Sequence, residues 1–145
     1  MQYYQTEDRI VTIVLSALYT TGWVGIGFSK DGMMVGGSAM VGWITKSGHA
    51  RIKQYHLRGR TQSEVVPNKG DLNLTGIPPV VVLDGANIYL GFQLQFNGSM
   101  EVEPTLLAYG SRYPVNHKLP MHDDKITLRI DYFTSRFSVF CLVCM

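Results

Sequence analysis

Short runs of β-branched and apolar residues, separated by turn residues, recur along the 145 residues of this chain. No stretch keeps the 3.6-residue apolar period of an amphipathic helix, because glycine, proline, asparagine and β-branched residues interrupt every candidate. About eight or nine strands with regular turns predict an all-β fold, an immunoglobulin-like antiparallel β-sandwich. We expect the main strands at residues 10–19, 23–28, 39–45, 50–57, 80–83, 87–96, 101–109 and 126–132.

Length and charge agree with a single β-rich domain. Single domains commonly have roughly 100–200 residues, and charged residues make up only 17% of this chain. The formal net charge is +2, and the basic residues form no cluster, so the sequence gives no reason to expect nucleic-acid binding. We expect residues 1–132 to form the domain and residues 133–145 to be an atypical apolar tail.

The two ends of the chain carry no targeting signal. Neither a signal peptide nor an apolar run long enough for a transmembrane helix is present. Both cysteines, Cys141 and Cys144, lie in the tail, without the helix of a redox motif or the following histidine of a haem-attachment motif. Sequons begin at Asn73 and Asn97; each alone is a weak indication of an extracellular parent protein.

Residues 23–28 alternate bulky side chains with Gly25 and Gly27. Successive side chains of a strand point to opposite faces, so this alternation predicts one face of large side chains and one bare face. A bare face lets a flat ligand or another backbone approach closely.

The residue pattern offers one pairing that could carry chemistry. Met33 and Met34 lie in a glycine-rich loop, whereas Met40 fits a strand core. A loop thioether could ligate haem iron, with a histidine such as His122 from the second long loop as partner. A Met and His pair is typical of electron-transfer cytochromes, although an exposed loop histidine and a packed methionine are the simpler interpretation. Without a C-x-x-C-H motif, such a haem would be non-covalent haem b.

Other catalytic classes find no support in the sequence. The four histidines form no zinc-hydrolase spacing, and no G-x-S-x-G nucleophile elbow occurs.

Several segments together resemble the plant DOMON domain, in the subgroup that is fused to a membrane cytochrome b561 region. The likeness spans roughly residues 9–132. It is carried by residues 22–29, 31–43, 89–94, 107–110 and 119–125.

The resemblance implies a sandwich like the cytochrome domain of cellobiose dehydrogenase, holding one haem b between a methionine and a histidine. Met34 matches the methionine ligand, with Met33 as fallback, and His122 matches the histidine, with His117 as fallback. Both loops would then lie at one end of the sandwich. Trp23, Phe28 and Tyr109 would line an apolar haem wall, although each also suits an ordinary core.

The implied function is electron transfer on the extracellular face of the plasma membrane, from ascorbate-type reductants to a partner redox protein. The chain would be an electron carrier rather than an enzyme. It departs from the family by lacking a signal peptide, strands before residue 10, and the membrane cytochrome b561 region after residue 132. A missing edge strand would expose a sheet edge. Alternatives are a haem-free sugar-binding, phenolic-binding or adhesion sandwich, or a non-functional truncated product.

Overall fold

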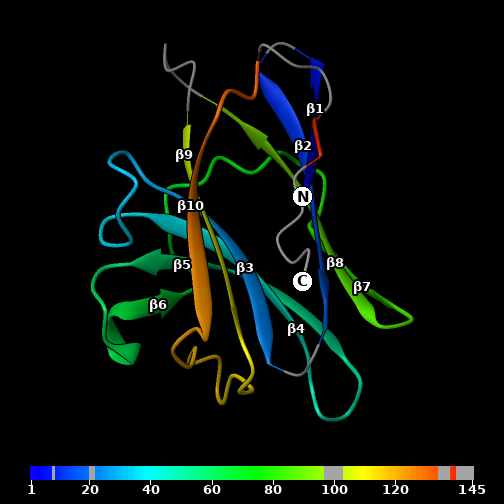
Figure 1. Cartoon of the computed structure of the whole chain (residues 1–145), viewed down its shortest axis with the longest axis vertical. Helices are drawn as coiled ribbons and strands as arrows, with labels where there is room; N and C mark the ends of the chain where they lie inside the picture. The colour runs from blue at the N-terminus through cyan, green and yellow to red at the C-terminus, as the bar shows by residue number, and fades with distance from the viewer. Residues whose placement is uncertain (8, 20–21, 97–102, 134–137, 140–145) are drawn as a thin grey trace.

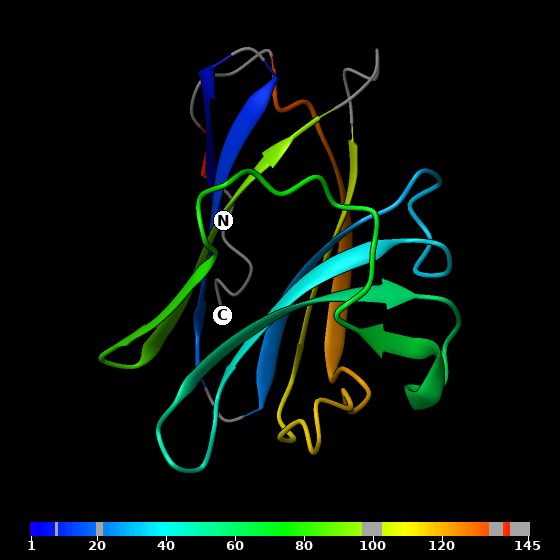
Figure 2. The same ribbon diagram turned by 180° about the vertical axis from the view of Figure 1, so that it is seen from behind.

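The computed structural model describes residues 1–7, 9–19, 22–96, 103–133 and 138–139. In this described part, the strands form two antiparallel sheets that pack face to face (Figures 1 and 2). One sheet has five strands in the order β11-β1-β2-β8-β7, and the other has six in the order β10-β9-β3-β4-β5-β6. The predicted all-β sandwich is confirmed. No helix among the described residues is long and apolar enough to cross a membrane.

The strands coincide closely with the apolar runs of the sequence. The five-stranded sheet contains β11 (Ser138–Val139), β1 (Gln2–Glu7), β2 (Ile10–Leu18), β8 (Asn87–Gln95) and β7 (Val80–Asp84). The six-stranded sheet contains β10 (Asp124–Ile130), β9 (Glu103–Gly110), β3 (Trp23–Phe28), β4 (Ser38–Ile44), β5 (Ala50–Leu57) and β6 (Val65–Pro67). A single 3₁₀ turn, η1 (Gln62–Glu64), stands between β5 and β6.

The expectation that no strand precedes residue 10 is wrong. β1 pairs with β2 on one side and with the short β11 on the other. Tyr3 of this strand is buried in the main core, while its neighbour Tyr4 is exposed, which is the alternation of a half-buried strand. Cys141, Cys144 and the sequon at Asn97 lie outside the described residues.

The main core fills the space between the two sheets. Alternate residues of β8 supply Ile88, Leu90 and Phe92 to it, and β3 supplies Val24, Ile26 and Phe28. Met40 is buried there, so its predicted role as a core residue is confirmed. The Tyr132 hydroxyl and the Thr105 hydroxyl are both buried and form a hydrogen bond of 2.8 Å.

Candidate functional site

A second apolar cluster lies on the outer face of the six-stranded sheet, away from the main core. We call it the outer cluster. Its buried members are Trp23, Ala39, Val41, Trp43, Tyr55, Leu57, Val65 and Leu119, and Met34 and Ala108 pack against them. An outer sheet face normally carries polar side chains, so a buried apolar cluster there marks the face as a candidate binding surface.

The predicted bare strip runs across this outer face. Gly25 pairs with Val41 and Ala108, and Gly27 pairs with Ala39 and Leu106. A side-chain carbon added at Gly27 would come no closer than 3.4 Å to any neighbour, so the glycine leaves room above the sheet. Trp23 precedes Gly25 by two positions in β3, so its side chain lies on the same face of the sheet as the strip, at one end of it.

The loop of residues 29–37 brings Met34 to the outer cluster. The Gly36 N–H donates to the Leu57 carbonyl oxygen (2.7 Å), and the Leu57 N–H donates to the Gly37 carbonyl oxygen (2.9 Å). These two bonds attach the loop to the end of β5. Met34 is half-buried against the cluster, whereas Met33 is 52% exposed. Of the two methionines, only Met34 is packed on this surface.

The loop of residues 111–123 covers the same face from another direction. Asn116 and His117 both have positive φ, 50° and 62°, and form the turn between the bridged residues Val115 and Lys118. The Tyr55 hydroxyl donates to the His117 carbonyl oxygen at 2.6 Å. The His117 ring centroid lies 6.2 Å from that of Trp43. This loop is therefore held across β4 and β5.

His122 lies in the last part of this loop, just before β10, and is half-buried. The next residue fixes the backbone there: the Asp123 N–H donates to the Tyr109 carbonyl oxygen (2.8 Å), and the Asp123 carboxylate accepts from the Ser111 N–H (3.1 Å). His122 is thereby tied to the end of β9.

The Trp23 indole ends the strip beside this attachment point. Its Nε1 atom is buried and has no hydrogen-bond partner among the described residues. A side-chain carbon at Gly110 would lie only 2.5 Å from that Nε1 and 3.3 Å from the Met121 carbonyl oxygen, so only glycine leaves space there. The outer face thus presents an unpartnered N–H donor near the segment that carries His122.

Two sequence-based expectations about this site need correction. β3 and β9 are antiparallel neighbours, so the loop after β3 and the loop after β9 leave opposite ends of the sheet, as Figures 1 and 2 both show. The two loops therefore do not lie at one end; each packs against the outer cluster from its own end of the sheet. Phe28 and Tyr109 pack in or against the main core, on the other side of the sheet from Trp23. The three aromatic residues therefore do not form one wall.

Tyr55 is the main residue of this site that the sequence analysis did not identify. Arg51 and Lys53 share its strand face and are charged, but Tyr55 is fully buried. Burial raises the pKa of Tyr55 above its ordinary value, which keeps the hydroxyl protonated as a donor. Leu57 lies on the same face, and this apolar pair two residues apart was the available signal.

The candidate donors carried by these two loops are a thioether and imidazoles. Within the described residues, no group of three or more histidine, cysteine or carboxylate side chains could hold a metal ion. The donor set is therefore unlike that of a calcium or structural zinc site, and a thioether with an imidazole suits haem iron.

Comparisons with known sequences show which family this chain belongs to. The sequence model of the DOMON domain family matches residues 2–103. Two Arabidopsis thaliana proteins, each named cytochrome b561 and DOMON domain-containing protein, are 52% identical over 133 residues (91% of this chain, 33% of the relative) and 32% identical over 144 residues (96% and 38%). The chain thus spans about a third of the length of these relatives.

A solved structure with a similar fold is the cytochrome domain of Myriococcum thermophilum cellobiose dehydrogenase. It superposes with a TM-score of 0.53 at 13% sequence identity, over 83% of this chain and 64% of that one. At this identity the likeness concerns the fold. With a family match over most of its length and close relatives that carry the domain in their names, the chain belongs to the DOMON domain family.

Proposed function

We propose that this domain is an electron-transfer module that binds one haem b on the outer face of the six-stranded sheet, between the thioether of Met34 and an imidazole nitrogen of His122. The observation that carries the proposal is the outer cluster itself, a buried apolar patch on a face that is usually polar. Family membership supports the same conclusion, because the close relatives are named as cytochromes.

The residues of the outer face fit such a group. A flat macrocycle needs a smooth apolar surface, and Gly27 keeps side-chain bulk off one part of this face, since a carbon added there would come no closer than 3.4 Å to a neighbour. Haem held by Met34 and His122 would supply reversible one-electron chemistry, and a thioether ligand would favour the reduced iron.

The chain's own residues would hold and orient the cofactor and exclude water from it. Leu119 and Trp43 contribute apolar surface, and the Tyr55 hydroxyl keeps the loop of residues 111–123 over the face. The domain would act as an electron carrier and not as an enzyme.

The proposed partners follow from the family. Electrons would pass between an ascorbate-type reductant and a redox protein, for which the membrane cytochrome b561 region of the relatives is the candidate. This arrangement corresponds to the extracellular face of the plasma membrane. The names of the relatives support the cytochrome b561 region as the partner; the reductant and the location are the proposal's own.

Optical spectroscopy of the reconstituted domain tests the ligands. The purified chain is mixed with hemin, and oxidised and dithionite-reduced spectra are recorded. We expect a six-coordinate low-spin spectrum in the wild type. Met34→Ala and His122→Ala should each convert it to a high-spin spectrum or abolish uptake, while circular dichroism confirms that the sandwich remains folded.

The fallback ligands provide the matched controls. Met33→Ala and His117→Ala remove the same chemical groups from the same two loops, and we expect both to retain the low-spin spectrum. A low-spin spectrum that survives in the Met34→Ala, His122→Ala double variant would refute the ligand assignment. If Met33→Ala alone loses the low-spin spectrum, Met33 and not Met34 is the methionine ligand.

A further inference from the structure

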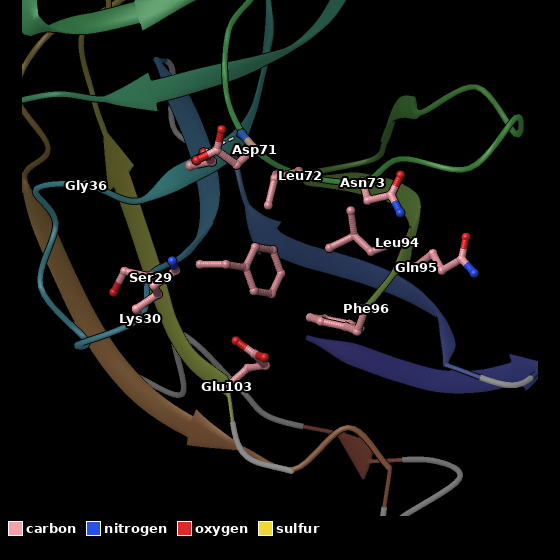
Figure 3. A pocket seen from close by; sticks show the side chains of 12 residues that line it. Ser29, Lys30, Gly36, Asp71, Leu72, Asn73, Leu94, Gln95, Phe96 and Glu103 are labelled. Atoms are coloured by element: carbon pink, nitrogen blue, oxygen red, sulfur yellow. Dashed lines mark hydrogen bonds between the residues drawn. The ribbon is translucent and has the colours of Figure 1, made fainter. Parts of the chain in front are cut away.

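A cavity lies on the opposite side of the six-stranded sheet from the outer cluster, where the two sheets separate near the ends of β3 and β8 (Figure 3). It encloses about 280 Å³, enough for a single ring-sized molecule and near the lower end of small-ligand sites. None of its lining residues belongs to the outer cluster. The cavity is therefore a site separate from the proposed haem face.

The inner part of the cavity is apolar and aromatic. Phe28 and Phe96 line it with ring centroids 6.1 Å apart and planes at 74°. Leu72 and Leu94 add aliphatic surface. Such a lining accepts an apolar ring, and the faces of phenylalanine rings attract a cation placed over them.

The charged group at the cavity is Glu103. Figure 3 shows its carboxylate directed into the space faced by Leu94 and Phe96. Glu103 is half-buried, and the Thr105 hydroxyl donates to its backbone carbonyl oxygen at 3.3 Å; among the described residues, none forms a hydrogen bond or an ion pair with its carboxylate. Burial raises the pKa of this carboxyl above its ordinary value, and the charge of Arg9 only partly offsets that effect.

Arg9 acts on the Glu103 carboxyl through its charge, but its hydrogen bond and its ring contact are made with other groups. Its Nε donates to the Phe96 carbonyl oxygen at 3.1 Å, and its guanidinium lies 4.5 Å from the centroid of the Phe133 ring. The cavity lining therefore contains a half-buried carboxylate that Arg9 compensates only in part, and a ligand that adds positive charge would relieve its desolvation cost.

Two further features favour a donor-bearing ligand. The Ser29 hydroxyl, whose residue is 7% exposed, lines the cavity and has no hydrogen-bond partner among the described residues. The charged lining residues are Lys30, Asp71 and Glu103, so acidic groups outnumber basic ones and an anionic ligand is disfavoured.

We propose that this cavity binds a small organic cation with an apolar ring, its ammonium group bonded to the Glu103 carboxylate and its ring placed between Phe28, Phe96 and Leu94. A neutral molecule of the same shape would gain the apolar contacts but not the charge-assisted hydrogen bond. An anion of the same shape would be repelled.

Three probes of nearly equal shape separate these contributions: benzylamine, benzyl alcohol and benzoate. Binding to the full chain is measured by isothermal titration calorimetry at neutral pH. We expect benzylamine to bind about tenfold or more tightly than benzyl alcohol, since a charge-assisted hydrogen bond is roughly twice as strong as a neutral one. We expect no binding of benzoate.

Variants at the charged rim then test the role of Glu103. Glu103→Gln should weaken benzylamine binding about tenfold while leaving benzyl alcohol within about twofold. Lys30→Gln removes the competing cation and should strengthen benzylamine binding. Asp84→Asn, an exposed carboxylate at the tip of the β7–β8 hairpin, is the matched control and should change nothing.

Backbone amide shifts locate the bound probe. We expect shifts at Phe28, Ser29 and Phe96, and the same affinity in the Met34→Ala variant, because the cavity shares no lining residue with the outer cluster. The proposal is overturned if benzylamine does not bind, if benzylamine and benzyl alcohol bind equally, or if the shifts centre on Trp43. None of these outcomes depends on haem uptake, so this proposal and the proposed function can fail separately.

Discussion

At the scale of single residues, Tyr55 connects the outer face to the loop that carries His117 and His122. Its hydroxyl donates to the His117 carbonyl oxygen across 62 positions of sequence. Tyr55→Phe removes this bond and leaves the ring in place. We expect a loss of about 1 kcal/mol in the free energy of unfolding, the usual net value of one such bond, measured by urea denaturation.

Tyr113→Phe is the matched control for that measurement. Tyr113 lies in the same loop, and its ring, which faces the Lys46 ammonium at 5.8 Å, is retained in the variant. We expect almost no change in the free energy of unfolding. Equal losses in the two variants would mean that the Tyr55 hydroxyl has no special role in holding the loop.

Glu103 makes a prediction about pH. Its pKa is raised in the folded protein, so the folded state binds the proton more tightly than the unfolded state does. The free energy of unfolding therefore gains a contribution as pH falls through the folded pKa, and this gain is complete below the ordinary value of 4.5. Glu103→Gln should remove that contribution and be more stable than the wild type at neutral pH.

Thermal melts of both proteins at neutral and mildly acidic pH check this prediction. The relevant quantity is the difference between the two, because Arg9, Lys30, Asp71 and Tyr132 surround or influence the same carboxyl and are present in both. A wild type that is the more stable protein at neutral pH would contradict the assigned direction of the shift.

At the scale of elements, the alternation of large residues and glycines along β3 gives the two faces of this strand different surfaces. Val24, Ile26 and Phe28 enter the main core, while Gly25 and Gly27 leave the other face open. Gly27→Leu should fill the strip above the sheet and block haem uptake. We expect hemin titration to show at least about a tenfold loss of affinity, because the apolar contact surface of the cofactor would be displaced.

Gly27→Ala is the companion variant. Its methyl group would lie 3.4 Å from the Ala39 Cβ, an ordinary contact, and we expect nearly normal uptake. Both variants should melt close to the wild type. Full haem uptake by Gly27→Leu would mean that the cofactor does not use this strip.

Local patterns predicted most of the elements, and long-range pairing explains the rest. The alternation in residues 23–28 predicted both β3 and its bare face, since strand faces follow from neighbouring residues. The loops of residues 29–37 and 111–123 leave opposite ends of the sheet because β3 pairs antiparallel with β9, and these two strands are about 80 residues apart in sequence. The burial of Tyr55 depends on a loop about 60 positions away in sequence, so no local pattern could reveal what covers it.

At the scale of the whole molecule, the six-stranded sheet divides two proposed sites. The outer cluster lies on one face, and the cavity beside Glu103 opens on the other. The loop of residues 29–37 takes part in both, since Met34 packs outward while Ser29 and Lys30 line the cavity. If both proposals hold, this arrangement would let the domain bind a cofactor and a small cation at once, without either ligand occupying the other's surface.

The free edge of the other sheet also belongs to this scale. Within the described residues, β7 pairs only with β8 and ends the five-stranded sheet. Val80 and Val82 of β7 are 55% and 52% exposed. An apolar edge strand with unpaired backbone groups is a template for pairing with another chain. We therefore expect the domain to self-associate as its concentration rises, measured by size-exclusion chromatography with light scattering.

Val82→Lys should reduce this self-association, because a charge on an edge strand opposes edge-to-edge pairing. Thr127→Lys is the matched control: it adds the same charge at an exposed position of β10, which ends the other sheet. If β7 is the contact, only Val82→Lys shifts the population toward monomer. An equal shift in both variants would assign the effect to net charge, and association that persists in both would exclude β7 as the pairing edge.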